Sequence, residues 1–310
     1  MRIVISEFMD DAAVDSLRQH FGAAAIHYDA NLVDNPTALS VAVADCDAFI
    51  VRNRTQVRGA LLDACGKVRV IGRLGVGLDN IDVAACEARG VRVIPATGAN
   101  ALAVAEYVIG TAMMLRRASY LSTAEVIAGK WPRNRLSAGR ESAGAVMGLI
   151  GFGSIGQLTA RLARSLGMSV IAYDPALPAT HPAWQEIGVQ PKSLEQITAG
   201  ADVISLHVPL LDATRNLFDA TRIAAMKPGA VLINTSRGGI VNEAAVVAAL
   251  KSGALGGAAL DVFTQEPLPA TADWADCPNL VLTPHIAGVS FEANIRVSSM
   301  IAAAVIDALN

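Results

Sequence analysis

Short apolar runs alternate along this chain with longer stretches in which apolar residues recur every three or four positions. The runs predict strands and the longer stretches predict amphipathic helices. In the first hundred residues, strands are predicted at 3–6, 48–52, 68–73 and 91–94, and helices at 10–20, 59–65 and 83–88. A second series predicts strands at 146–150, 169–173, 203–206, 231–234, 258–262 and 280–282. Continuous apolar strands that alternate with helices indicate an α/β fold with parallel sheets covered on both faces.

Two domains are expected from this pattern. A long helix is predicted between the two series, over 101–119, with Asn100 as its N-cap. A last helix, over 290–309, has an apolar face and no strand of its own, so we expect it to return to the first domain. The 310 residues correspond to about two domains at roughly 150 residues each. We therefore expect two doubly wound parallel sheets, one formed by 1–99 with 287–310 and one by the inserted segment 100–286.

Composition and charge narrow the class of protein. Hydrophobic residues make up 53% of the chain and charged residues 17%, which excludes a disordered protein. The net charge of −3 leaves no surplus of cations for nucleic acid. The longest apolar helix candidate, 101–115, contains Glu106 and is shorter than the ~20 residues of a membrane span. The four cysteines lie far apart, the five histidines are scattered, and the start shows no signal-peptide pattern. We expect a soluble cytoplasmic protein with no metal, nucleic-acid or membrane site.

A glycine-rich run follows the strand predicted at 146–150 and precedes a helix predicted at 157–166. Its members are Gly151, Gly153, Ser154, Ile155 and Gly156. In dinucleotide-binding folds such glycines permit a tight turn, a close approach to the pyrophosphate and close packing of helix on strand. Asp174 ends the next strand, 18 residues after the last glycine, where a carboxylate accepts ribose hydroxyls and repels a 2′-phosphate. This context predicts NAD rather than NADP; the alternative is a structural turn with a surface aspartate.

Three later segments each end a predicted strand, with the sequences NTSRGG at 234–239, DVFTQEPL at 261–268 and TPHIAG at 283–288. Together with the glycine run, GRLGVGLDNID at 72–82 and LHVPL at 206–210, they resemble the D-isomer-specific 2-hydroxyacid dehydrogenase family, in particular its phosphoglycerate dehydrogenase-like branch. The resemblance covers essentially the whole chain. It implies a Rossmann NAD-binding domain inserted into a flavodoxin-like substrate domain, and NAD-dependent interconversion of a 2-hydroxy acid and its 2-keto acid.

The resemblance also implies roles for individual residues. His285 would exchange the proton of the reacting oxygen, Glu266 would pair with it, and Arg237 would bind the substrate carboxylate. The backbone N–H groups of Val76 and Gly77 would form a second carboxylate anchor. Besides the glycine run and Asp174, cofactor contacts are expected at His207, Pro209, Thr214, Thr235, Asp261 and His285. Each of these side chains has a purely structural alternative, and for His207 the two are evenly balanced.

Four arginines bear on the substrate. Arg52 and Arg54 lie at the end of a predicted strand, in a stretch similar to one that meets the second anionic group in this branch. Arg133 and Arg135 follow Trp131 and resemble cations that the branch sends into the neighbouring subunit's site. The four favour a lactate with a charged 3-substituent, either 3-phosphoglycerate or 3-sulfolactate; a solvated loop face is the alternative.

Two features weigh against phosphoglycerate. The sequence shows no regulatory domain up to residue 310, and its opening at 5–10 departs from the usual start of phosphoglycerate dehydrogenases. A sulfolactate dehydrogenase-like enzyme is therefore a second possibility within the branch. Outside it, a non-catalytic NAD(H)-sensing scaffold and a formate- or phosphite-type dehydrogenase remain open. The apolar helix at 101–119 and the Trp131 loop correspond to the region through which family members pair, so we expect a homodimer.

Overall fold

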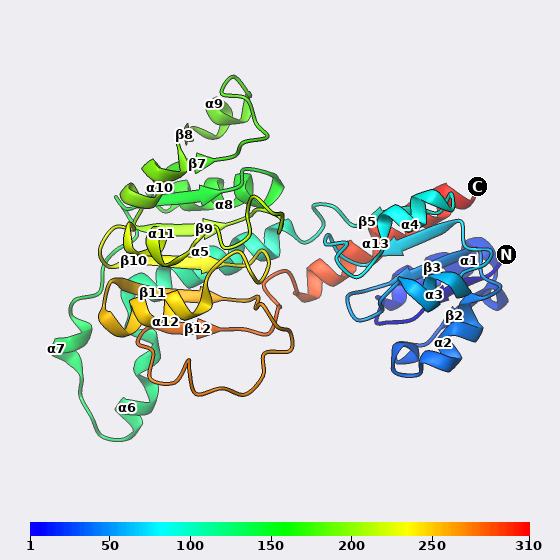
Figure 1. The fold of residues 1–310 in the computed structure, drawn as a ribbon, viewed down its shortest axis with the longest axis horizontal. Coiled ribbons are helices and arrows are strands. Elements are labelled where there is room, and N and C mark those ends of the chain that lie inside the picture. Colours follow the sequence, from blue (N-terminus) through cyan, green and yellow to red (C-terminus); the bar gives the residue numbers. More distant parts are fainter. The chain divides into compact units, whose positions relative to one another are not determined.

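The computed structural model describes residues 1–310 and divides them into two α/β units (Figure 1). The first unit consists of Met1–Asn100 and Val289–Asn310, and the second of Ala101–Gly288. The predicted boundaries, 1–99 with 287–310 and 100–286, lie within two residues of these. None of the helices combines the length and the apolar composition that a membrane span requires.

The first unit is built on a five-stranded parallel sheet with the order β2-β1-β3-β4-β5. Its strands are β1 (Ile3–Ile5), β2 (Ile26–Tyr28), β3 (Ala48–Val51), β4 (Val70–Arg73) and β5 (Arg92–Pro95). Its helices are α1 (Asp11–Phe21), α2 (Pro36–Val43), α3 (Gly59–Ala64), α4 (Val83–Ala88) and α13 (Phe291–Leu309), with 3-10 turns η1 (Ala23–Ala25) and η2 (Leu32–Asp34). This strand order is that of the flavodoxin-like doubly wound fold.

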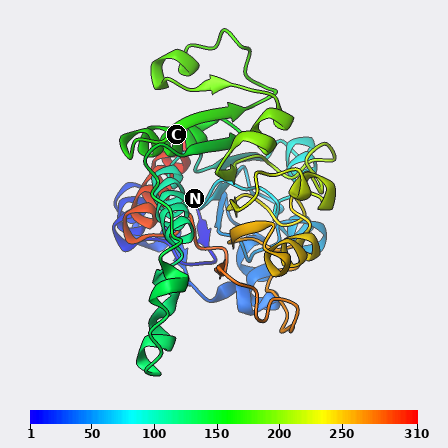
Figure 2. The same cartoon turned by 90° about the vertical axis from the view of Figure 1, so that its left-hand side faces the viewer.

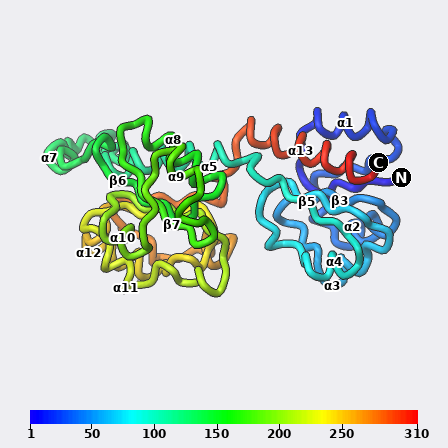
Figure 3. The backbone as a smooth tube through the Cα atoms, turned by 90° about the horizontal axis from the view of Figure 1, so that it is seen from above, coloured from blue at the N-terminus to red at the C-terminus, as the bar shows by residue number.

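Alternate residues of these strands enter two separate cores. α1 and α13 cover one face of the sheet, and α2, α3 and α4 cover the other (Figure 3). α13 lies directly on β4, because a Cβ added at Gly72 would come within 2.7 Å of Ile301 Cγ2. The predicted return of the last helix to the first domain is thereby confirmed.

The second unit contains a seven-stranded parallel sheet with the order β12-β11-β10-β9-β6-β7-β8. Its strands are β6 (Val146–Ile150), β7 (Ser169–Tyr173), β8 (Gln190–Pro191), β9 (Val203–Leu206), β10 (Ala230–Asn234), β11 (Leu255–Leu260) and β12 (Leu280–Leu282). Its larger helices are α5 (Ala101–Arg117), α8 (Ser154–Ser165), α10 (Leu194–Gly200) and α12 (Glu243–Ser252). Shorter ones are η3 (Tyr120–Ser122), α6 (Thr123–Ile127), α7 (Arg133–Leu136), α9 (Ala183–Ile187) and α11 (Ala220–Ala224).

This arrangement is a Rossmann fold, with α5 and α8 on one face of the sheet and α10, α11 and α12 on the other (Figure 3). The order in which the strands are added to the sheet reverses between β6 and β9, and such sheets bind ligands at this switch point. The segment that holds α6 extends away from the sheet of its own unit (Figures 1 and 2). The predicted fold class, two doubly wound parallel sheets, is confirmed.

Several local predictions need correction. Asn100 does not cap α5, because its Oδ1 is buried without a hydrogen-bond partner. The loop expected around Trp131 runs directly into the short helix α7, Arg133–Leu136. The strand expected at 258–262 is β11, which spans Leu255–Leu260. Its earlier start is not predicted because Gly256 interrupts the apolar run. That glycine is required there, since a Cβ would come within 2.2 Å of the Gly229 carbonyl oxygen.

Candidate active site

An imidazole and a carboxylate form the centre of the site in the second unit. His285 follows β12 and Glu266 lies in the loop after β11. His285 Nδ1 is 2.7 Å from Glu266 Oε2, while Glu266 Oε1 accepts a hydrogen bond of 3.0 Å from the Phe263 N–H. The carboxylate is thus fixed by its own loop and fixes the ring in turn. Nε2 is the ring nitrogen that this arrangement leaves for a reacting oxygen.

The backbone at His285 is held in an uncommon conformation by Asp261. His285 has φ 55°, in the left-handed region that costs a non-glycine residue about 1 kcal/mol or more. Its N–H donates to the Asp261 carbonyl oxygen at 2.8 Å. The Asp261 carboxylate, 1% exposed, accepts the N–H groups of Ile286 and Ala287 at 2.8 Å each, and the Thr283 hydroxyl at 2.6 Å. Asp261 therefore shapes the loop that presents His285; its expected contact with the cofactor stays a prediction.

Arg237 comes from the strand next to β11. It follows β10, and its carbonyl oxygen accepts a 2.9 Å hydrogen bond from the Asn234 side chain. Its guanidinium Nη1 donates to the Ser236 carbonyl oxygen. The next residue, Gly238, touches the Glu266 loop so closely that a Cβ would lie 1.8 Å from the Phe263 carbonyl oxygen. β10, β11 and β12 are neighbouring parallel strands. Arg237, Glu266 and His285 therefore all come after the carboxyl ends of these strands, at the same end of the sheet.

The glycine run fits a dinucleotide. Gly151 has φ 97°, and a Cβ there would come within 2.4 Å of the His207 carbonyl oxygen. A Cβ at Gly156 would come within 2.4 Å of the Gly151 carbonyl oxygen, whereas one at Gly153 would enter open space. The first N–H groups of α8, beginning at Ser154 and Ile155, receive no side-chain cap, so they remain available to a pyrophosphate. These residues could hold NAD, which supplies or accepts the hydride when it is bound.

Asp174 lies directly after β7, and its carboxylate is oriented by two backbone groups. Oδ2 accepts the Phe152 N–H at 2.8 Å, and Oδ1 accepts the Ala176 N–H at 2.9 Å. The first of these bonds ties the carboxylate to the glycine run itself. The remaining acceptor capacity of the two oxygens suits ribose hydroxyls.

Orphaned polar atoms border this region. Both ring nitrogens of His207 and the Thr235 hydroxyl are buried without a hydrogen-bond partner in the chain. Burial lowers the pKa of His207 to about 4, so its ring is neutral near pH 7. Buried polar groups without partners are rare in proteins and are typical of ligand sites. Thr214 differs, because its hydroxyl donates to the Pro209 carbonyl oxygen and shapes that loop.

The first unit holds the remaining predicted substrate residues. Val76 and Gly77 lie in the loop after β4, and neither of their N–H groups has a hydrogen-bond partner in the chain. Arg52 and Arg54 lie in the loop after β3 and differ in their contacts: Arg54 is ion-paired with Asp34, whereas Arg52 donates to the neutral amide oxygen of Asn294 at 2.7 Å. The two free backbone N–H groups of Val76 and Gly77 are suited to bind an anion.

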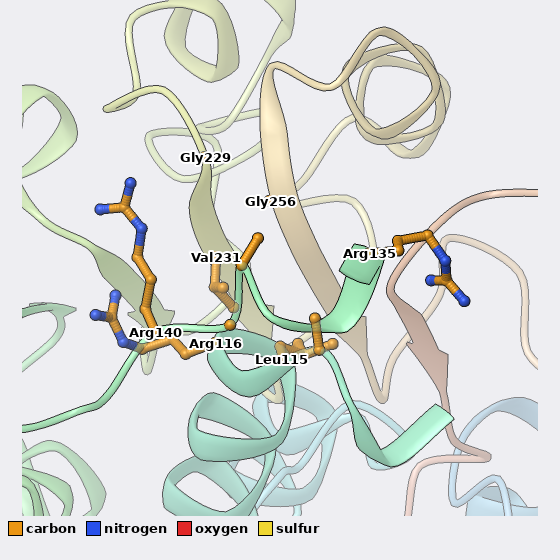
Figure 4. A pocket seen from close by; sticks show the side chains of 10 residues that line it. Leu115, Arg116, Arg135, Arg140, Gly229, Val231 and Gly256 are labelled. Atoms are coloured by element: carbon orange, nitrogen blue, oxygen red, sulfur yellow. The ribbon is translucent and has the colours of Figure 1, made fainter. Parts of the chain in front are cut away.

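Arg133 and Arg135 lie on α7, at the end of the second unit's sheet where the strands begin. Arg135 is ion-paired with Glu125 of α6. It also lines a pocket of about 160 Å³ whose wall includes Gly229 and Gly256, where β10 and β11 begin. Figure 4 shows that its side chain points away from Arg116 and Arg140 of the same pocket. This pocket is separate from Arg237, Glu266 and His285, which follow the carboxyl ends of the strands.

No sequence motif identifies the residues that hold these loops. Glu7, Asn80 and Asn294 contact the Arg52 loop across large distances in sequence. Tyr107 and Thr283 join hydroxyl to hydroxyl at 2.7 Å beside Asp261. The only available signal was Glu7 itself, a lone charge in the otherwise uncharged stretch from 3 to 9.

The fold and the site define a two-domain, NAD-dependent dehydrogenase, and comparisons specify its family. The sequence profile described as "D-isomer specific 2-hydroxyacid dehydrogenase, NAD binding domain" matches residues 109–287. The (S)-sulfolactate dehydrogenase of Chromohalobacter salexigens is 50% identical over 96% of this chain and 94% of its own length. D-3-phosphoglycerate dehydrogenase 2, chloroplastic, of Arabidopsis thaliana is 38% identical over 99% of this chain, which spans only 48% of that protein.

Solved structures agree. The TT0316 protein of Thermus thermophilus matches with a TM-score of 0.88 at 30% identity, covering 100% of this chain and 97% of that one. The NAD-dependent formate dehydrogenase of Staphylococcus aureus, in complex with NAD, matches with a TM-score of 0.84 at 27% identity, covering 100% and 96%. This chain belongs to the D-isomer-specific 2-hydroxyacid dehydrogenase family. The predictions of family, NAD as cofactor and 2-hydroxyacid dehydrogenase activity are confirmed.

Proposed function

We propose that this enzyme interconverts a 2-hydroxy acid bearing an anionic group at C3, foremost 3-sulfolactate, and the corresponding 2-keto acid. The observation that carries this proposal is the state of Arg52. Its guanidinium is half-buried, faces the Phe8 ring at 5.8 Å and donates to Asn294, but it forms no ion pair with a carboxylate. A guanidinium that is held in place without a counter-ion is suited to bind an anionic ligand.

The other arginines support the proposal less. The charge of Arg54 is met by Asp34, and that of Arg135 by Glu125. An anion would have to displace these carboxylates before binding. We therefore assign the C3 anion to Arg52 and keep Arg54, Arg133 and Arg135 as secondary candidates. The 50% identity to a sulfolactate dehydrogenase supports the sulfonate over the phosphate.

The reacting end of the substrate is assigned to the second unit. In the direction of reduction, His285 would donate the proton to the carbonyl oxygen through Nε2 while Glu266 holds Nδ1. Arg237 would bind the C1 carboxylate with paired N–H donors, and the N–H groups of Val76 and Gly77 would bind it from the main chain. Ser154, Ile155, Asp174, His207, Pro209, Thr214, Thr235 and Asp261 remain the proposed contacts to NAD.

The deciding experiment measures NADH formation with 3-sulfolactate, 3-phosphoglycerate, malate, glycerate, lactate and formate. We expect kcat/KM to be highest for a 3-anionic acid. In Arg52→Ala it should fall by about 30-fold, the effect of removing about 2 kcal/mol of charge recognition, with little change for lactate. Arg54→Ala is the matched control and should have a much smaller effect. A wild-type enzyme that prefers lactate or formate would refute the proposed substrate class.

We also propose a homodimer formed through the segment from η3 to α7. This segment exposes several large apolar side chains within twelve residues, Tyr120, Leu121, Ile127 and Trp131, of which Ile127 is 82% and Trp131 77% exposed. Clusters of this kind mark protein–protein contact sites. Light scattering should give twice the 32.2 kDa mass of the chain.

A cytoplasmic location is proposed as well, because all four cysteines are free thiols, as a reducing compartment favours.

A further inference from the structure

A buried carboxylate holds the backbone of the loop that carries Arg52 and Arg54. Glu7 follows β1 and is only 4% exposed. Its Oε1 accepts the N–H groups of Arg52 at 2.9 Å and Thr55 at 3.0 Å, and its Oε2 accepts the N–H of Arg54 at 3.1 Å. A buried charge is costly unless hydrogen bonds compensate for it, and three backbone donors do so here.

The same loop is held from its carbonyl side by Asn80. The buried Asn80 amide donates to the carbonyl oxygens of Arg52 at 3.0 Å and Thr55 at 2.7 Å. The Ser6 and Thr55 hydroxyls, 3.0 Å apart, add a contact between the two segments. Glu7 thus binds backbone N–H groups of the loop, and Asn80 binds its backbone carbonyl groups. The direction in which the Arg52 side chain leaves the backbone is therefore fixed before any ligand binds.

Glu7 also places a negative charge near Arg52 without occupying its guanidinium. Burial lowers the pKa of Arg52, and the charge of Glu7 acts against that effect. Because the Glu7 oxygens bind backbone N–H groups, they form no ion pair with the Arg52 side chain. A direct ion pair, such as that of Arg54 with Asp34, would compete with an anionic ligand. The carboxylate thus supports the arginine charge and leaves its donors to the ligand.

We propose that Glu7 is the positioning residue for recognition of the C3 anionic group, acting through the backbone of residues 52–55; this rests on the proposed function, which assigns that group to Arg52. Replacing Glu7 with glutamine keeps the size of the side chain but turns one acceptor into an NH2 group. That group would face a backbone N–H, so at least one of the three bonds is lost.

The test is steady-state kinetics of Glu7→Gln with 3-sulfolactate and with lactate. We expect KM for 3-sulfolactate to rise about tenfold, the size expected from loss of one hydrogen bond to a charged group, while its kcat changes less than about twofold. The KM for lactate, which has no C3 anion, should change little. Glu7→Asp keeps both acceptors on a shorter side chain and should give an intermediate KM.

Two further variants separate positioning from general destabilisation. Asp10→Ala removes the N-cap of α1, which accepts the Ala12 N–H in the same segment, and should lower thermal stability without changing KM for 3-sulfolactate. Asn80→Ala removes the hydrogen bonds to the loop's carbonyl oxygens and should reproduce the KM increase. If Glu7→Gln does not fold, Asn80→Ala tests the inference in its place. An unchanged KM in Glu7→Gln, or an equal increase in Asp10→Ala, would overturn the inference. A wild-type enzyme without preference for 3-anionic acids would refute the proposed function first, and this inference with it.

Discussion

The loop after β12 and the loop after β3 are built in the same way but treat their functional side chains differently. In each, a buried carboxylate on the neighbouring strand's end accepts backbone N–H groups: Asp261 holds the His285 loop and Glu7 holds the Arg52 loop. His285, however, has a second carboxylate on its ring, whereas Arg52 has none on its guanidinium. An acid–base group needs a fixed orientation, and an anion-binding group needs an uncompensated charge.

The largest effect is expected at the side chain of the His285 loop. His285→Asn should lower kcat by about 10³-fold, because general acid–base catalysis is lost, while NAD binding is retained. Asparagine is chosen because it tolerates the left-handed φ of 55° better than alanine. Turnover and NADH fluorescence titration measure the two properties separately. His181→Ala, at a histidine outside the site, is the control; near-normal turnover of His285→Asn would remove His285 from the mechanism.

A smaller effect is expected when the backbone support of this loop is weakened. In Asp261→Asn, the amide can still accept from Thr283 and Ile286, but its NH2 group faces the Ala287 N–H. We expect kcat to fall by about 10²-fold through displacement of His285, and the free energy of unfolding to fall by about 2 kcal/mol. Chemical denaturation and turnover measure both.

The control for Asp261→Asn lies in the same unit. Thr198→Val removes one buried hydrogen bond, from the Thr198 hydroxyl to the Leu194 carbonyl oxygen, at a site that touches neither loop. It should cost about 1 kcal/mol of stability with kcat unchanged. If Asp261→Asn loses stability but keeps its kcat, the carboxylate only stabilises the fold and does not position His285.

The sequence alone predicts the strands of this protein far better than it predicts these supports. β6, β7, β9 and β12 match their predicted ranges because each is a short, predominantly apolar run. β2 was missed, since only Ile26 of its three residues is buried at this edge of the sheet. Local pattern decides the first case and tertiary pairing the second.

The same division holds in the site. His285, Glu266 and Arg237 stand in contiguous motifs, so a resemblance could identify them. Glu7 lies 45 residues before its partner Arg52, and Asn294 lies 242 residues after it. Asp34 is separated from Arg54 by 20 residues of helix and strand. No periodicity or motif connects such pairs, which is why sequence patterns cannot distinguish Arg52 from Arg54 as the structure does.

The smallest effect is expected from the ion pair that makes Arg54 unlike Arg52. Asp34→Asn leaves the size of the side chain unchanged and removes the charge that meets Arg54. Because both partners are exposed and solvent screens the pair, it contributes little to stability, so the free energy of unfolding should hardly change. The released guanidinium should lower KM for 3-sulfolactate by no more than about threefold, and only at low salt, where exposed charges are weakly screened. Lactate kinetics serve as the control for a general effect on the enzyme. A large fall in KM would mean that Asp34 masks a principal anion-binding arginine, and the contrast between Arg52 and Arg54 would then be wrong.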